Sequence, residues 1–190
     1  MKLTFFGAAR AVTGSCHCLE VNGKRILIDC GLQQGRDEID NRQLDFQPGY
    51  IDYVLVTHAH IDHSGRLPLL VKLGYQGPII TTRLTGRLLS IMLRDSAHIQ
   101  ESDAQWENAE AALALVETRE YGELFDVCPG VRCRFVDAGH LLGSACVELW
   151  LTEGDVERKI VFSGDLGNVD QPIIRDPQFI DQADYVVTES

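Results

Sequence analysis

The order of its expected elements predicts an α/β fold for this chain, with two β-sheets packed face to face and helices outside them. Short apolar runs typical of strands come first, helical patterns fill the middle, and strands return afterwards. This order argues against a simple alternation of strand and helix. With 190 residues, 45% of them hydrophobic, the chain is long enough to bury one substantial core.

The expected strands are short runs of apolar, β-branched or aromatic residues. They lie at 2–6, 16–21, 25–30, 53–57, 79–81, 131–136, 145–151, 159–163 and 185–188. Asn22 and Gly23 separate the second run from the third and are typical of a tight hairpin turn. The polar stretch 31–48 predicts a long loop, and such loops in compact domains are often functional.

Three helices are expected in the middle of the chain. Ser64 is placed to cap the first, which runs through RLPLLVKL and stops at Gly74. The second, over 84–99, carries apolar residues at helical spacing. The third, over 103–117, is rich in Ala, Glu and Leu, which are good helix formers.

Composition narrows the class of protein. The chain has a net charge of -11, from 28 acidic and 17 basic residues. It therefore lacks the excess of basic residues that is usual in nucleic-acid binders. Two bound divalent ions would restore positive charge where a phosphate sits, and a partner segment could carry a basic groove. Since no apolar run reaches the roughly 20 residues of a membrane helix and the N-terminus lacks a secretory pattern, we expect a cytoplasmic protein with no membrane partner.

The six cysteines are scattered, and none form a CxxC pair. Cys16, His17 and Cys18 look like metal ligands at first sight. Alternate residues of a strand point to one face, however, which would separate His17 from the two thiols. We therefore expect reduced, mostly buried thiols. His98 follows a helical stretch, and we expect it on the helix surface.

Four candidate metal ligands lie within six residues: His58, His60, Asp62 and His63. Imidazole and carboxylate together suit zinc and similar ions. A loop between an apolar strand and a helix can direct His58 and His60 at one ion, and Asp62 and His63 at another. The alternative is a solvated loop rich in histidine. It is disfavoured because three of the six histidines of the chain gather here, beside an aspartate and at a strand end.

Two more candidate ligands stand at strand ends. His140 follows the strand 131–136, Asp165 follows the strand 159–163, and glycines flank both residues. Alone, His140 would more often be a loop or core histidine, and Asp165 a turn aspartate. Together with the histidine cluster, both become candidate ligands.

These motifs resemble those of the metallo-β-lactamase superfamily. HAHIDH at 58–63 is similar to its HxHxDH motif, while AGHLLGSA at 138–145, FSGDLG at 162–167 and LIDCG at 27–31 look like its other motifs. The longer form THAHIDHSGRLP, with AGHLLGS and the closing Thr188-Glu189-Ser190, resembles the β-CASP branch in particular. That branch contains RNA-processing nucleases related to the catalytic subunit of the cleavage and polyadenylation complex. The resemblance spans nearly the whole chain and implies the αββα sandwich of the superfamily.

The resemblance also implies a role for each matching residue. The implied zinc ligands are His58, His60 and His140 for a first ion, Asp62 and His63 for a second, and Asp165 as a bridge between the two. Glu189 matches an acidic residue that pairs with a later histidine in the branch, and Asp29 matches one that supports the site from beneath. Asp62, Asp165 and Glu189 are thereby the implied catalytic residues.

The chain departs from the family pattern at its end. The β-CASP branch inserts a second domain after the glutamate motif, and the returning part supplies the last histidine of the second ion. We therefore expect residues 1–190 to be the N-terminal portion of the lactamase domain, without the β-CASP domain and the C-terminal portion. A weakened second zinc site is expected, as is self-association through an exposed sheet edge or apolar face.

The function implied by the resemblance is that of a zinc-dependent phosphodiesterase, a ribonuclease that cleaves single-stranded RNA with hydroxide made available by two metal ions. Three alternatives stay open: another hydrolase of this fold such as a thioesterase or lactonase, a nuclease directed at DNA, and a non-catalytic partner subunit. The intact ligand set argues against the last. The sequence leaves open whether cleavage is internal or from an end.

Overall fold

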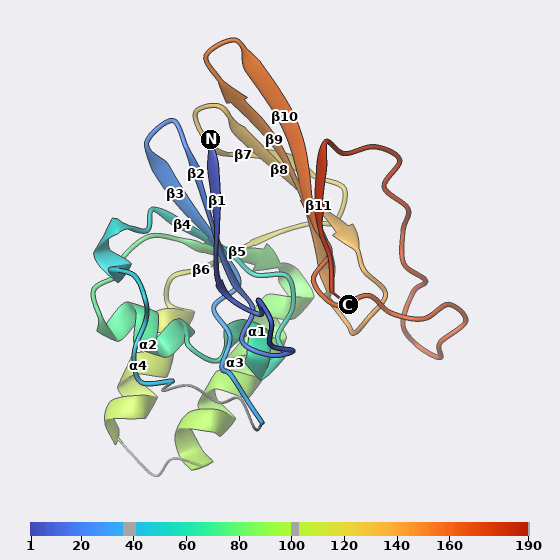
Figure 1. Ribbon diagram of the computed structural model, residues 1–190. Helices are drawn as coiled ribbons and strands as arrows, with labels where there is room; N and C mark the ends of the chain where they lie inside the picture. The colour runs from blue at the N-terminus through green and yellow to red at the C-terminus, as the bar shows by residue number, and fades with distance from the viewer. Residues whose placement is uncertain (36–40, 100–102, 190) are drawn as a thin grey trace.

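Two β-sheets lie face to face in the structure, a computed structural model that describes residues 1–35, 41–99 and 103–189 (Figure 1). Within these residues the first sheet has the strand order β1 (Lys2–Gly7), β2 (Cys16–Val21), β3 (Lys24–Ile28), β4 (Tyr53–Leu55), β5 (Ile79–Thr82) and β6 (Val116–Arg119). The second has the order β11 (Tyr185–Val187), β10 (Val156–Phe162), β9 (Ala145–Glu153), β8 (Val131–Asp137) and β7 (Leu124–Cys128). The two packed sheets confirm the predicted fold class.

The first sheet begins with antiparallel strands and continues with parallel ones. β1, β2 and β3 are antiparallel, whereas β3, β4, β5 and β6 run parallel. The hairpin between β2 and β3 turns at Asn22 and Gly23, whose φ angles of 48° and 74° are those of the predicted tight turn. Since β3 and β4 are parallel, the loops that follow them leave the sheet at the same edge, where the candidate ligands of the HAHIDH motif begin.

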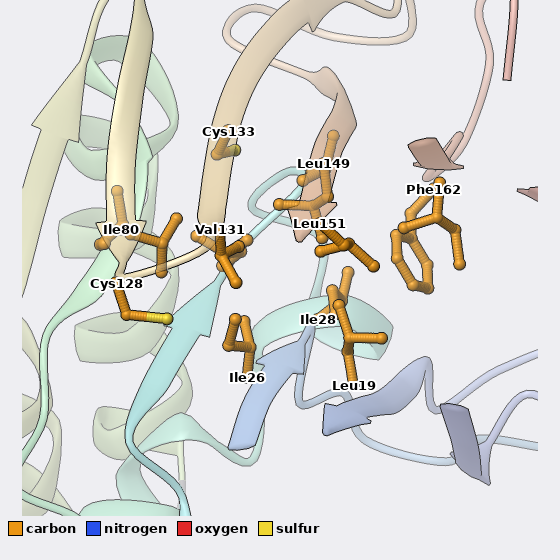
Figure 2. Packing of buried hydrophobic residues seen from close by; sticks show 14 of the residues in the cluster. Leu19, Ile26, Ile28, Ile80, Cys128, Val131, Cys133, Leu149, Leu151 and Phe162 are labelled. Atoms are coloured by element: carbon orange, nitrogen blue, oxygen red, sulfur yellow. The ribbon is translucent and has the colours of Figure 1, made fainter. Parts of the chain in front are cut away.

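Buried side chains from both sheets fill the space between them (Figure 2). Ile26 and Ile28 come from the first sheet, and Leu149 and Leu151 from the second. Every second residue of β9 points inward, as the period of two in a strand requires. This shared core fixes the position of each sheet relative to the other.

Helices cover the other face of the first sheet (Figure 1). The described helices are α1 (Ile61–Ser64), α2 (Leu67–Lys72), α3 (Arg83–Ile99), α4 (Asp103–Leu113) and the 3-10 turn η1 (Pro48–Tyr50). Leu70 and Leu89 pack with Val54 in the core below this sheet. The outer face of the second sheet instead contacts Ile180 and Ala183 of the segment that leads to β11. No helix of the described residues is long and apolar enough to span a membrane.

Three expectations about single elements are wrong. The helix expected over 103–117 ends at Leu113, and Val116–Arg119 forms the parallel edge strand β6. The strand β7 was not expected at all. Ser64 does not cap the helix that follows, because it is the last residue of α1 and its hydroxyl donates to the carbonyls of Ala59 and His60. The next helix, α2, has no side-chain cap at its N-terminus.

Candidate metal centre

The predicted site residues converge at one edge of the sandwich. His58 and His60 follow β4, whereas Asp62 and His63 lie in the short helix α1. From the second sheet come His140, in the loop after β8, and Asp165, in the loop after β10. Residues separated by up to 107 positions in the sequence thus share one site, because both sheets end their strands at this edge.

Three imidazoles and one carboxylate form a compact set of donor atoms. Nε2 of His58 and Nε2 of His140 lie 3.1 and 3.2 Å from Nδ1 of His60. Oδ2 of Asp165 lies 3.6 Å from Nε2 of His58 and 3.5 Å from Nε2 of His140. All four ligand atoms lie within 4.8 Å of one another. A tetrahedral zinc ion with bonds near 2.0 Å has ligand atoms about 3.3 Å apart. The spacing and the chemistry of this donor set therefore fit a divalent ion.

Asp165 connects this set to the other candidate ligands. Its Oδ2 faces His58 and His140, while its Oδ1 lies 3.0 Å from Nε2 of His63. The hydrogen bond with His63 is the main reason that the pKa of Asp165 falls to about 2. Asp62 approaches the same nitrogen of His63, with its Oδ2 4.0 Å from Nε2. The carboxylate of Asp165 is therefore placed between two groups of donors, although the compact set does not include Asp62 or His63.

The charged state of the histidines differs across the site. Burial and the neighbouring His63 lower the pKa of His58 to about 3, so its ring is neutral at pH 7. Burial and His140 also lower the pKa of His60. Burial acts in the same direction on His63, but the carboxylates of Asp29 and Asp165 outweigh it and raise its pKa to about 10. Without a metal ion, His63 is thus a buried cation held between two carboxylates.

Asp29 supports the site from beneath, as the resemblance implied. It follows β3, is buried, and accepts hydrogen bonds from the backbone of Thr57 at 2.8 Å and from Nδ1 of His63 at 2.7 Å. Burial opposes its ionisation, but the charge and the hydrogen bond of His63 keep its pKa below the usual value. Its φ of 59° is uncommon for a non-glycine residue, and is held by the bond from its own N–H to the carbonyl of Leu55.

Two polar residues of this support were not assigned a role from the sequence. The hydroxyl of Thr57 donates to Asp29 at 2.9 Å, and that of Ser15 donates to it at 3.3 Å. Thr57 directly precedes the histidine motif, so its position at the strand end was the available signal. Ser15 lies far from the motif in sequence, and the pairing of β2 with β3 together with the bond from its N–H to the carbonyl of Asp62 brings it near.

Close backbone contacts hold the loops of the site together. A Cβ atom on Gly31 would lie 1.5 Å from the carbonyl oxygen of Asp62, so only glycine fits there. The N–H of Cys30 donates to the carbonyl of His63 at 2.8 Å. The loop after β3 is thereby bonded to the histidine motif, which fixes Asp29 beneath it.

Glu189 lies at the side of a hollow of about 640 Å³ that Asp62, His63 and Asp165 also line. Its carboxylate accepts a hydrogen bond from the N–H of Leu166 at 2.6 Å. Glu189 therefore stabilises the loop that carries Asp165.

The remaining sequence expectations about cysteine and histidine are confirmed. All six cysteines are free and buried. Cys16 and Cys18 belong to the core between sheet and helices, whereas His17 lies on the opposite face and stacks near Phe162. His98 is exposed on α3.

Comparisons with known proteins identify the family. The model of the metallo-beta-lactamase superfamily matches residues 9–187. A ribonuclease from Thermus thermophilus is 42% identical over 191 residues, which cover 100% of this chain and 43% of that protein. The transcription termination factor FttA of Methanosarcina mazei is 36% identical over 174 residues, which cover 87% of this chain and 27% of that protein. The chain thus spans less than half the length of these curated relatives.

Solved structures share the fold. A metallo-β-lactamase with a HARLDQ motif from Cronobacter sakazakii superposes with a TM-score of 0.58 at 20% identity, covering 90% of this chain and 62% of the other. A B3 metallo-β-lactamase with an active-site glutamic acid superposes with a TM-score of 0.56 at 22% identity, covering 90% and 65%. The resemblance inferred from the motifs is confirmed, and the names of the sequence relatives agree with its RNA-processing branch. The chain therefore belongs to the metallo-β-lactamase superfamily.

Proposed function

We propose that this chain supplies the metal centre of a ribonuclease that hydrolyses phosphodiester bonds in single-stranded RNA with the help of two zinc ions. The observation that carries the proposal is the convergence of three imidazoles and a carboxylate on one point. We assign His58, His60, His140 and Asp165 to the first ion, and Asp62, His63 and Asp165 to the second.

Each residue of the site has its own chemical role in this proposal. Bound divalent ions lower the pKa of a water molecule and offset the charge of a phosphate. Asp165 holds the two groups of donors together, since each of its oxygens faces a different group. Asp62 is placed beside His63 to accept a proton or a hydrogen bond from the attacking water. Glu189 acts on the reaction through the Asp165 loop, whose Leu166 N–H it binds.

The names of the relatives favour RNA as the substrate. One is a ribonuclease, and another is a transcription termination factor. The net charge of -11 disfavours a polyanion, but two divalent ions would concentrate positive charge at the point where the phosphate must sit. Because these relatives extend well beyond the length of this chain, the proposed activity is that of the whole protein, in which residues 1–190 form the N-terminal portion of the metallo-β-lactamase domain.

The experiment that tests this function offers the full-length protein single-stranded RNA, single-stranded DNA and a thioester, with zinc or manganese supplied. We expect cleavage of RNA, and a loss of more than about 100-fold in Asp165→Asn, which keeps the shape but removes the charge. Asp155→Asn, in the exposed turn between β9 and β10, is the matched control and should retain activity. Rapid turnover of the thioester without cleavage of nucleic acid would overturn the proposal.

Two further properties stay predictions. We expect the protein to act in the cytoplasm. We also expect residues 1–190 alone to self-associate, because β11 is an edge strand on which Tyr185 and Val186 are exposed. Sedimentation of the isolated segment at several concentrations would measure this.

A further inference from the structure

The side chain of Thr57 lies at the centre of the hydrogen bonds beneath the metal centre. Its hydroxyl oxygen is 2.9 Å from Oδ2 of Asp29 and 3.0 Å from Nδ1 of His58. All three side chains are buried, with at most 1% of each residue exposed. Water therefore does not compete for these bonds, and each proton among them has a defined place.

The direction of these bonds follows from the chemistry of the groups. An ionised carboxylate only accepts hydrogen bonds, so the hydroxyl proton of Thr57 is donated to Asp29. The same oxygen of Thr57 can then only accept from His58, whose proton must sit on Nδ1. A neutral imidazole carries one proton, and Nε2 of His58 is left with its lone pair. That lone pair faces Nδ1 of His60 and Oδ2 of Asp165.

The same carboxylate orients a ligand of the other group. Oδ2 of Asp29 accepts from Nδ1 of His63 at 2.7 Å, and the opposite nitrogen of His63 faces Asp165. A single oxygen thus holds His63 directly and His58 through Thr57. We propose that Thr57 is a positioning residue that fixes the metal-binding tautomer of His58 and, through Asp29, links the orientation of His58 to that of His63. This inference rests on the metal site of the proposed function.

Packing leaves Thr57 no freedom to turn away. Its backbone N–H donates to Oδ1 of Asp29 at 2.8 Å, and its carbonyl accepts from Ala145 of the second sheet at 2.9 Å. A Cβ atom on Gly164 would lie 2.8 Å from the Cβ of Thr57 and 3.0 Å from its hydroxyl oxygen. Because Gly164 has no side chain, the loop that carries Asp165 can lie directly against Thr57. The Thr57 hydroxyl then keeps its hydrogen bonds with Asp29 and His58.

The first test is the tautomer of His58 in the metal-free full-length protein, read from long-range ¹H–¹⁵N spectra of the imidazole rings at pH 7. We expect the Nδ1–H form in the wild type and in Thr57→Ser, which keeps the hydroxyl. Thr57→Val has nearly the same shape but offers no acceptor, so His58 should shift towards the Nε2–H form. The matched control is Thr81→Val, since the buried hydroxyl of Thr81 donates to the Val56 carbonyl rather than to a candidate ligand. An unchanged Nδ1–H form in Thr57→Val would overturn the inference.

The second test is zinc affinity by competition with a chelator. Thr57→Val should bind zinc about 10–100-fold more weakly than the wild type, and Thr57→Ser should restore most of the difference. Equal affinities of Thr57→Val and the wild type would also overturn the inference. If the wild type itself binds no metal, the proposed function fails, while the tautomer spectra still decide the role of Thr57. A purely structural role would lower the stability of Thr57→Val and leave its tautomer as in the wild type.

Discussion

The free energy of unfolding of the metal-free protein should depend on pH, mainly through His63 and His58. The pKa of His63 is raised from 6.5 to about 10, so its contribution is fully present below pH 6.5 and is lost as the pH rises towards 10. The pKa of His58 is lowered from 6.5 to about 3, so keeping it neutral costs stability as the pH falls below 6.5. The two effects together predict maximal stability near pH 6.5.

The size of the alkaline decline follows from the shift at His63. A proton bound in the folded state but absent from the unfolded state changes the free energy of unfolding by about 1.4 kcal/mol per pH unit. In the unfolded protein the His63 ring is still partly protonated near pH 6.5. The free energy of unfolding therefore falls by only about 2 kcal/mol between pH 6.5 and 8.5. His63 has only 9% of its side chain exposed, so solvent screens this interaction little.

The assay is urea unfolding with a chelator present, at half-unit steps of pH from 5 to 8.5. We expect the free energy of unfolding to rise up to pH 6.5 and then to fall by about 2 kcal/mol. His63→Gln should remove the alkaline decline, whereas His98→Gln, at an exposed position on α3, should keep it. A wild-type profile that is flat or rising between pH 6.5 and 8.5 would refute the reasoning.

Two substitutions test the packing that supports the site. Gly31→Ala puts a methyl group 1.5 Å from the carbonyl oxygen of Asp62, so we expect a loss of about 3 kcal/mol in unfolding free energy and weaker metal binding. Gly49→Ala meets nothing closer than 4.0 Å and should change neither, and equal effects of the two would contradict this. Phe135→Ala empties a fully buried position between the sheets and should cost about 3–5 kcal/mol, measured by urea unfolding. A cost below about 1 kcal/mol would show that Phe135 does not support the core.

Strands with a strong apolar signal could be predicted from the sequence, but edge strands could not. β6 and β7 each end a sheet, and in β6 no residue is fully buried. Their sequences, VETR and LFDVC, mix charged and apolar residues, because an edge strand needs less apolar surface. Because the residues before β6 are good helix formers, the helix predicted from the sequence ran on into this strand.

The candidate ligands of the site could be predicted from the sequence, but the residues that hold them in place by hydrogen bonds could not. His58, His60, Asp62 and His63 lie within six residues at a strand end, so the sequence alone groups them. Thr57 and Ser15 owe their roles to Asp29, which reaches them through the register of β2, β3 and β4. The choice of nitrogen is also a property of the fold, because His60 directs Nδ1 at the other ligands whereas His58 and His140 direct Nε2.

The most direct test of the metal centre is an anomalous X-ray diffraction measurement at the zinc edge on crystals of the zinc-loaded protein. We expect a peak within about 2.0–2.2 Å of Nε2 of His58, Nδ1 of His60 and Nε2 of His140, with Asp165 completing the set. A second, weaker peak is expected between Asp62, His63 and Asp165. Zinc bound only elsewhere, or no peak among the three histidines in protein that has been saturated with the metal, would contradict the account.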